Sequence, residues 1–147
     1  MFAKKNFDQA VRRAQQPQNS EAVKVIVRCR PFLPNEVKKQ EKNCIFVENE
    51  TNQVSILRER HSREYKTFRY DGVFDEHCSQ QDVYGLAAFA VVEKSFAGYN
   101  GTVFAYGQTG CGKTYTMVGG SQPDQRGIMP NVFDHVFQIV QQQKSGL

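Results

Sequence analysis

The sequence predicts an α/β fold with a mixed sheet, a βαβ unit and a small antiparallel hairpin lobe. Three observations support this class. Short β-branched runs occupy the first half, and two of them flank a polar turn. A helix-periodic run precedes another β-branched run, and a glycine-rich loop joins that run to a further helix. Strand, helix and strand in this order form a right-handed parallel unit.

The first predicted strand is Val23–Arg28, which follows a polar leader at residues 1–22 that we expect to be flexible. Pro31 and Pro34 end this strand, because proline cannot donate a hydrogen bond to a sheet. The expected organisation is therefore the leader followed by one folded portion, residues 23–147.

The hairpin lobe is predicted from two short apolar runs, Ile45–Val47 and Val54–Leu57, on either side of the polar turn Asn49–Asn52. A longer run, Glu64–Phe74, predicts a further strand that ends at Asp75. This last strand is the first strand of the predicted βαβ unit.

A helix is predicted next, with Ser79 as its N-cap and Asp82 in the capping-box position. Apolar residues recur at helical spacing until Gly98 ends the run. Gly101–Tyr106 is the second predicted strand of the βαβ unit, and Asn131 is the expected cap of a final helix.

A complete G-x-x-x-x-G-K-[ST] phosphate-binding pattern follows the second strand directly. Its glycines let the backbone curl so that successive N–H groups face an anion. Lys113 is expected to reach the β- and γ-phosphates of a purine nucleoside triphosphate, and the Thr114 hydroxyl to take one Mg²⁺ position. The alternative is a glycine-rich turn with an incidental Lys-Thr pair. The expected phosphate-binding residues are Gly107, Gln108, Thr109, Gly110, Cys111, Gly112, Lys113 and Thr114.

Composition argues against several other classes. The formal net charge of +4 is spread along the chain, and the basic cluster Lys38, Lys39 and Lys42 alternates with acidic residues, which favours a solvated loop over a nucleic-acid contact. The cysteines and histidines lack metal-ligand or disulfide spacing. For Cys111, a redox-active thiol and a small loop residue both stay open. With no signal peptide and no membrane-length apolar run, we expect a soluble cytoplasmic protein.

Several segments beyond the loop resemble the motor head of kinesins, the microtubule-based ATPases. The run Gly98–Met117 is similar to that family's nucleotide loop almost end to end. The other similar segments are Val27–Pro31 (the adenine-side motif), Tyr70–Asp75, Val83–Tyr84 and Gly127–Pro130. The resemblance spans roughly residues 22–143.

The resemblance implies an ATP- and Mg²⁺-dependent motor that moves along microtubules on the cytoskeleton. Two alternatives stay open. Arg28 and Arg30 of the adenine-side motif could be merely solvated on one face of a strand, and Tyr84 of the first helix could be an ordinary core residue. The sequence leaves the oligomeric state undetermined. By the resemblance, the residues around the adenine are Arg28, Arg30, Pro31, Tyr84 and Tyr115.

The resemblance also implies that the family's switch segments and microtubule-binding elements come after the position of Leu147, and that Gly101–Tyr106 would then lack both neighbouring strands. After Thr114 the carboxylates are Asp124 and Asp134, and neither follows a strand pattern as a second Mg²⁺-organising carboxylate would. We therefore assign no catalytic residue and interpret the chain as a partial kinesin-type head, from a truncated gene product or a partial sequence. A catalytically inactive nucleotide-binding or regulatory module is the alternative.

Overall fold

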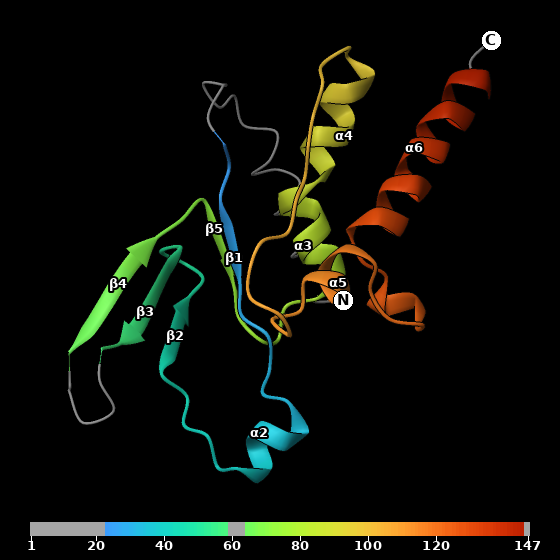
Figure 1. The fold of residues 1–147 in the computed structure, drawn as a ribbon. Coiled ribbons are helices and arrows are strands. Elements are labelled where there is room, and N and C mark those ends of the chain that lie inside the picture. The colour runs from blue at the N-terminus through green and yellow to red at the C-terminus, as the bar shows by residue number, and fades with distance from the viewer. Residues whose placement is uncertain (1–22, 59–63, 146–147) are drawn as a thin grey trace. The chain divides into compact units, whose positions relative to one another are not determined.

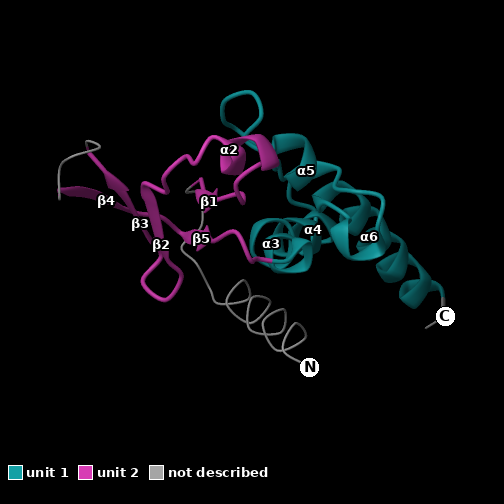
Figure 2. Ribbon diagram, turned by 90° about the horizontal axis from the view of Figure 1, so that it is seen from below, with its two compact units in different colours: residues 1–20, 79–147 teal, residues 21–78 magenta. Residues whose placement is uncertain are grey.

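The computed structural model describes residues 23–58 and 64–145 (Figure 1). The leader predicted at residues 1–22 lies outside the described residues. The described chain forms two compact units, coloured separately in Figure 2: unit 2 lies within Glu21–Cys78 and unit 1 within Ser79–Leu147. No described helix combines the length and the apolarity needed to cross a membrane.

An antiparallel sheet of three strands forms one part of unit 2, in the order β2 (Ile45–Glu48), β3 (Gln53–Leu57) and β4 (Tyr65–Arg69). Cross-strand side-chain pairs support it. The Ser55 and Thr67 hydroxyls lie 2.8 Å apart, and the rings of Phe46 and Tyr65 meet edge to face. The predicted hairpin lobe is therefore confirmed, with a third strand added to it.

A parallel pair of strands, β1 (Ile26–Arg28) and β5 (Gly72–Phe74), forms the second sheet of unit 2. Val25 and Asp71, the residues directly before these two strands, are joined by two hydrogen bonds. The Val25 N–H donates to the Asp71 carboxylate at 2.7 Å, and the Asp71 N–H donates to the Val25 carbonyl at 3.0 Å. The first strand thus begins three residues later than predicted.

The single strand predicted at Glu64–Phe74 is wrong, because this segment contributes to both sheets. Its first part is β4, in the antiparallel sheet, and its second part is β5, paired with β1. The change occurs at Tyr70, whose N–H donates to the Asn52 carbonyl at 3.0 Å and so closes the antiparallel sheet. The apolar pattern alone did not reveal this change of partner.

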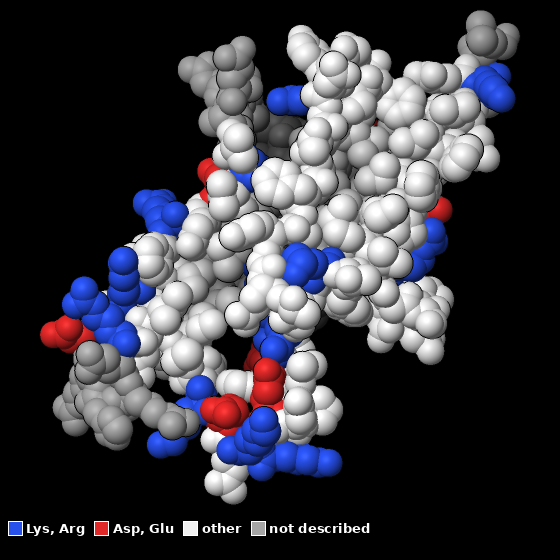
Figure 3. All heavy atoms as spheres, in the orientation of Figure 1, with Lys and Arg blue, Asp and Glu red and all other residues white. Residues whose placement is uncertain are grey.

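A short helix, α2 (Pro34–Lys38), was not predicted from the sequence. We interpreted its proline as a strand breaker, but proline at the first helical position is favourable because its missing N–H would have no partner there. Glu36 supports the start of the helix by accepting a hydrogen bond from the Leu33 N–H at 2.7 Å. Figure 3 shows basic and acidic side chains interspersed around α2, as expected for a solvated segment.

Unit 1 begins with two helices, α3 (Gln80–Ala87) and α4 (Phe89–Phe96), where we predicted one. The capping box is confirmed: the Asp82 N–H donates to the Ser79 hydroxyl, and the Ser79 N–H donates to the Asp82 carboxylate, both at 3.0 Å. The break lies at Ala88, which is fully buried and has a non-helical φ of −123°. Gly98, at a φ of 91°, follows the end of α4 as expected.

The remaining helices of unit 1 are α5 (Lys113–Met117), the 3₁₀ turn η1 (Pro123–Gln125) and α6 (Ile128–Ser145). Figure 1 shows α6 beside α3 and α4, with which it packs. The prediction that Asn131 caps α6 is wrong, because the helix begins three residues earlier. The Asn131 amide instead donates to the carbonyls of Arg126 and Gly127, at 2.8 Å each.

The strand predicted at Gly101–Tyr106 is not formed in the described structure, and neither is the βαβ unit that needs it. No backbone hydrogen bond joins residues 101–106 to another described residue. The side chains of Phe104 and Tyr106 are 72% and 94% exposed. This outcome agrees with the expectation that the segment would lack neighbouring strands. A run with strand propensity does not become a strand without a partner.

Candidate nucleotide-binding site

The predicted phosphate-binding loop forms an irregular turn that leads directly into α5. Gly110 and Gly112 have φ angles of 81° and 99°, in the left-handed region where residues with a Cβ are strained. Gly112 is the residue immediately before the helix. The glycines at these positions are therefore required by the backbone path and not only by the sequence pattern.

The first glycine of the loop, Gly107, also has a positive φ, of 152°, and in addition has little space for a side chain. A Cβ on Gly107 would lie 2.6 Å from the Cys111 sulfur, a distance shorter than real contacts allow. The Cys111 N–H also donates to the Gln108 carbonyl at 3.3 Å. Cys111 is half-buried against its own loop, an arrangement that agrees with the role of a small loop residue.

Lys113 spans this loop from the start of α5. Its ammonium donates to the carbonyls of Gly107 and Gln108, at 2.8 Å in both cases. Two of its three N–H bonds are thus used by the loop, and the positive charge is held at the loop backbone. Thr114 is exposed, so its hydroxyl is accessible to solvent. One ammonium, one hydroxyl and a left-handed backbone turn are the groups expected for binding a phosphate chain.

Tyr84, predicted near the adenine, lies in the packed interior of unit 1 and is 5% exposed. Its hydroxyl is 2.6 Å from Nδ1 of His135, and Nε2 of the same imidazole is 2.8 Å from the Glu93 carboxylate. The ring of Phe89 stacks on the imidazole. Burial, and to a lesser extent the charge of Glu93, raises the pKa of Tyr84. This environment favours the core role that the sequence left open, and a contact with a base stays a prediction.

Tyr115 is the second predicted base neighbour in unit 1 and lies in α5. Its side chain is 43% exposed, and its carbonyl accepts a hydrogen bond from the Gln80 side chain. The ring is therefore available at the surface of the unit, directly after Lys113 and Thr114 in the chain.

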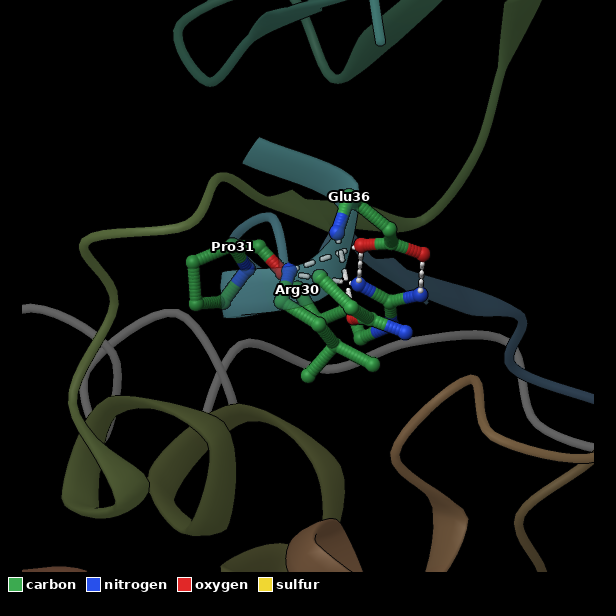
Figure 4. A network of polar contacts seen from close by, with 5 residues as sticks. Arg30, Pro31 and Glu36 are labelled. Atoms are coloured by element: carbon green, nitrogen blue, oxygen red, sulfur yellow. Dashed lines mark hydrogen bonds and ion pairs between the residues drawn. The ribbon is translucent and has the colours of Figure 1, made fainter. Parts of the chain in front are cut away.

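The adenine-side arginines lie in unit 2, where β1 ends at Arg28 and Arg30 follows it. Figure 4 shows the Arg30 guanidinium facing the Glu36 carboxylate, with which it forms two hydrogen bonds of 2.7 and 2.8 Å. The guanidinium also donates to the Pro31 carbonyl at 2.8 Å. This pairing lowers the pKa of Glu36 to about 2, with a smaller contribution from the Leu33 N–H. Arg30 is held in place by a carboxylate and is not simply solvated.

Two residues of these environments were missed from the sequence, Gln80 and Glu36. Gln80 shares a helical face with Val83, Tyr84 and Ala87, and this position on the apolar face of α3 is the signal that could have identified it. It is 3% exposed. For Glu36, the signal was its place three residues after Leu33, where a glutamate can accept from the backbone at the start of a helix.

Comparison with known proteins places this sequence in a family. A model of the kinesin motor domain matches residues 28–146. The kinesin-like protein klp-20 of Caenorhabditis elegans is 44% identical over 121 residues, which are 82% of this chain and 19% of that protein. The kinesin-like protein KIF3C of Bos taurus is 42% identical over 121 residues, 80% of this chain and 15% of that protein, and its Mus musculus counterpart is 40% identical. The chain thus spans a fifth or less of these relatives, and it belongs to the kinesin motor domain family.

Proposed function

We propose that the chain is the ATP-binding part of a microtubule-based motor, in which ATP binding and hydrolysis by the complete head drive movement along microtubules. The observation that carries this proposal is the turn at residues 107–114, with its left-handed glycines and the Lys113 ammonium held over it. Family membership supports the same function. We propose that the complete motor is located in the cytoplasm and acts on the cytoskeleton.

The residues present fit a nucleoside triphosphate with Mg²⁺. Lys113 would bind the terminal phosphates, and the exposed Thr114 hydroxyl would take one position on the cation. The described residues contain no group of three histidine, cysteine or acidic side chains that could hold a metal alone. This fits Mg²⁺, which is commonly held by few protein ligands together with substrate phosphates and water. The bound triphosphate supplies the hydrolysable bond, and this chain's groups hold and orient it.

At the base end we propose Arg28, Arg30 and Pro31, as the family resemblance implies. A guanidinium is planar and can stack on a purine, and the two hydrogen bonds that Arg30 donates to Glu36 keep the Arg30 plane in one orientation. Tyr115 is the candidate from unit 1, because its ring is partly exposed. For Tyr84 we propose a supporting role in the core of unit 1.

The test of the proposed function is the affinity for ATP and Mg²⁺, measured by titration calorimetry on the 147-residue chain and on Lys113→Ala. Loss of a charge-assisted contact to phosphate should weaken binding by roughly 10- to 150-fold. Lys94→Ala is the matched control, because Lys94 is an exposed lysine on α4 in the same unit. Equal affinities for the wild-type chain and Lys113→Ala would reject the phosphate-loop assignment.

A second candidate function is a nucleotide-binding or regulatory module that does not hydrolyse ATP. The observation that favours it concerns residues 115–147 alone: Asp124 lies in η1, and Asp134 lies in α6 with its carboxylate 2.6 Å from the Arg126 guanidinium. Neither follows a strand. ATP turnover measured with and without microtubules separates the two functions, because only a motor head should be stimulated by the filament.

A further inference from the structure

Gln80 is a buried polar side chain at the first position of α3. Its amide nitrogen donates two hydrogen bonds, to the Tyr115 carbonyl at 2.7 Å and to the Gln125 carbonyl at 3.0 Å. The first acceptor belongs to α5, the helix that begins with Lys113. One side-chain amide therefore connects α3 with the helix that follows the phosphate loop and with η1.

The Tyr115 carbonyl is one of the last four carbonyls of α5, which ends two residues later, at Met117. The last four carbonyls of a helix have no partner within the helix. In a longer helix the Gly119 N–H would serve Tyr115, but here it donates to the Thr114 carbonyl at 3.3 Å. Gln80 supplies a donor from a neighbouring helix instead, and so caps α5 from outside.

The Gln125 carbonyl is part of the turn that closes behind α5. The Gly120 N–H donates to it at 2.9 Å, and the Gly127 N–H donates to the Val118 carbonyl at 3.0 Å. The turn is tight, since a Cβ on Gly119 would lie 2.0 Å from the Gln125 carbonyl oxygen. Gln80 thus bonds to both sides of the C-terminal end of α5, the helix itself and the segment that returns past it.

Hydrogen bonds of this kind matter more for α5 than for the other helices of unit 1. All of its five residues are described, and none of them is buried. A helix of one and a half turns with no buried side chain has little apolar packing to fix its axis. Polar contacts at its two ends therefore contribute to its position beside its packing on α6, and Lys113, with its two bonds to the loop carbonyls, is the contact at the other end.

We propose that Gln80 is a positioning residue for the phosphate loop: by holding the Tyr115 and Gln125 carbonyls it fixes the axis of α5, and with it the place of Lys113 and Thr114. This inference rests on the proposed function, because it concerns the same phosphate site. Gln80 does not touch the phosphate chain. It acts through the two backbone carbonyls that it binds.

The first test replaces Gln80 with methionine, which is also unbranched and of similar size but has no donor. Inorganic triphosphate with Mg²⁺ is the probe, because it reports on the phosphate site alone. We expect Gln80→Met to bind it about tenfold more weakly, and the loop amides of Gly107, Gly110 and Gly112 to shift in NMR spectra. The matched control is Gln81→Met, a change at the adjacent, exposed glutamine, which should alter neither.

The outcomes separate the two proposals. If the wild-type chain does not bind triphosphate, the proposed function fails. If the wild-type chain binds it and a folded Gln80→Met binds equally well with unchanged loop amides, the positioning role of Gln80 is overturned. Unfolding of Gln80→Met would overturn it too, because the side chain would then serve stability in general.

The second test uses Gln80→Glu, whose carboxyl can donate a hydrogen bond only when it is protonated. Triphosphate binding by this variant should approach that of wild type at acidic pH and fall as the carboxyl ionises, because a carboxylate repels both carbonyls. Gln81→Glu controls for titration of the probe and for the added acidic group, and the charged residues Lys113, Asp124 and Arg126 are the same in both variants. Identical pH profiles for the two variants would contradict the proposal.

Discussion

Residues 72–74 and residues 101–106 have similar sequence character and different structures. Both are rich in residues that favour strands. β5 pairs with β1, and Val73 within it is only 4% exposed, whereas residues 101–106 pair with no described strand and leave Phe104 72% exposed. Propensity permits a strand, and hydrogen bonds from a neighbour make one.

The same comparison shows what determines the phosphate loop. The loop turns through its left-handed glycines even though the segment before it is unpaired. Its shape therefore follows from its local sequence. The contacts next to it are those of the helix that follows, α5, whose C-terminal end is hydrogen-bonded by Gln80 and by the turn at Gly119. Local sequence can therefore form this turn although no described strand pairs with the segment before it.

The largest expected effect separates the two segments directly. Val73→Asp places a charge at a buried position of β5 and should reduce the free energy of unfolding by about 4 kcal/mol or more. Phe104→Asp makes the same kind of change in the exposed segment and should stay within about 0.5 kcal/mol. Urea unfolding of both variants measures the difference. Similar losses would mean that residues 101–106 are packed in solution.

Hydrogen exchange sharpens the comparison at the level of single amides. The Cys29 and Asp71 N–H groups donate to the Phe74 and Val25 carbonyls at 2.8 and 3.0 Å, and they should exchange at least about 100-fold more slowly than free peptides. Val103, Phe104 and Ala105 should exchange at nearly the free rate, because no described residue bonds their amides. Protection of these three amides would show that a strand pairs with them in solution.

Features that depend on neighbouring residues in the chain could be predicted from the sequence. The capping box at Ser79 and Asp82, the stop at Gly98 and the turn of the phosphate loop are of this kind. The hairpin lobe was predicted because its two strands flank a short turn. Each of these features needs only a few adjacent residues.

Features that depend on distant partners could not be predicted. The segment containing Tyr70 changes sheets because of hydrogen bonds to Asn52 and Val25, residues far from it in the sequence. The break at Ala88 lies at a fully buried position that helical periodicity does not mark. In the site, the contact between Gln80 and the Tyr115 carbonyl spans 35 residues. An apolar pattern indicates that a residue is buried, but it does not identify the residue or backbone group that it will contact.

A smaller effect distinguishes the packed from the exposed tyrosine. Tyr84→Phe removes the hydroxyl that bonds His135 and should lower the free energy of unfolding by roughly 0.5–1.5 kcal/mol. Tyr106→Phe, at a residue that is 94% exposed, should have no measurable effect. Thermal unfolding measures both, and ATP titration of the same variants adds a second comparison. Loss of ATP affinity without loss of stability in Tyr84→Phe would support the predicted contact between Tyr84 and the base.

The smallest effect concerns the acid stability of unit 2. Hydrogen bonds from Arg30, then from the Leu33 N–H, lower the pKa of Glu36 from its ordinary value of 4.5 to about 2 in the folded protein. A carboxyl whose pKa is lower when folded contributes stability that is fully present above its unfolded pKa and is lost as the pH falls through its folded pKa. The stabilisation by this pair should therefore decline between about pH 4.5 and pH 2.

Glu36→Gln tests this dependence, because glutamine keeps the shape of the side chain and does not titrate. The variant should be less stable than wild type at pH 6, and the difference should narrow as the pH falls towards 2, because the wild-type carboxyl then protonates and its advantage disappears. Urea unfolding at several pH values measures the gap. Glu50→Gln, an exposed change in the same unit, controls for the loss of one negative charge. A gap that stays constant down to pH 2 would mean that the two hydrogen bonds between Arg30 and Glu36 do not persist in solution.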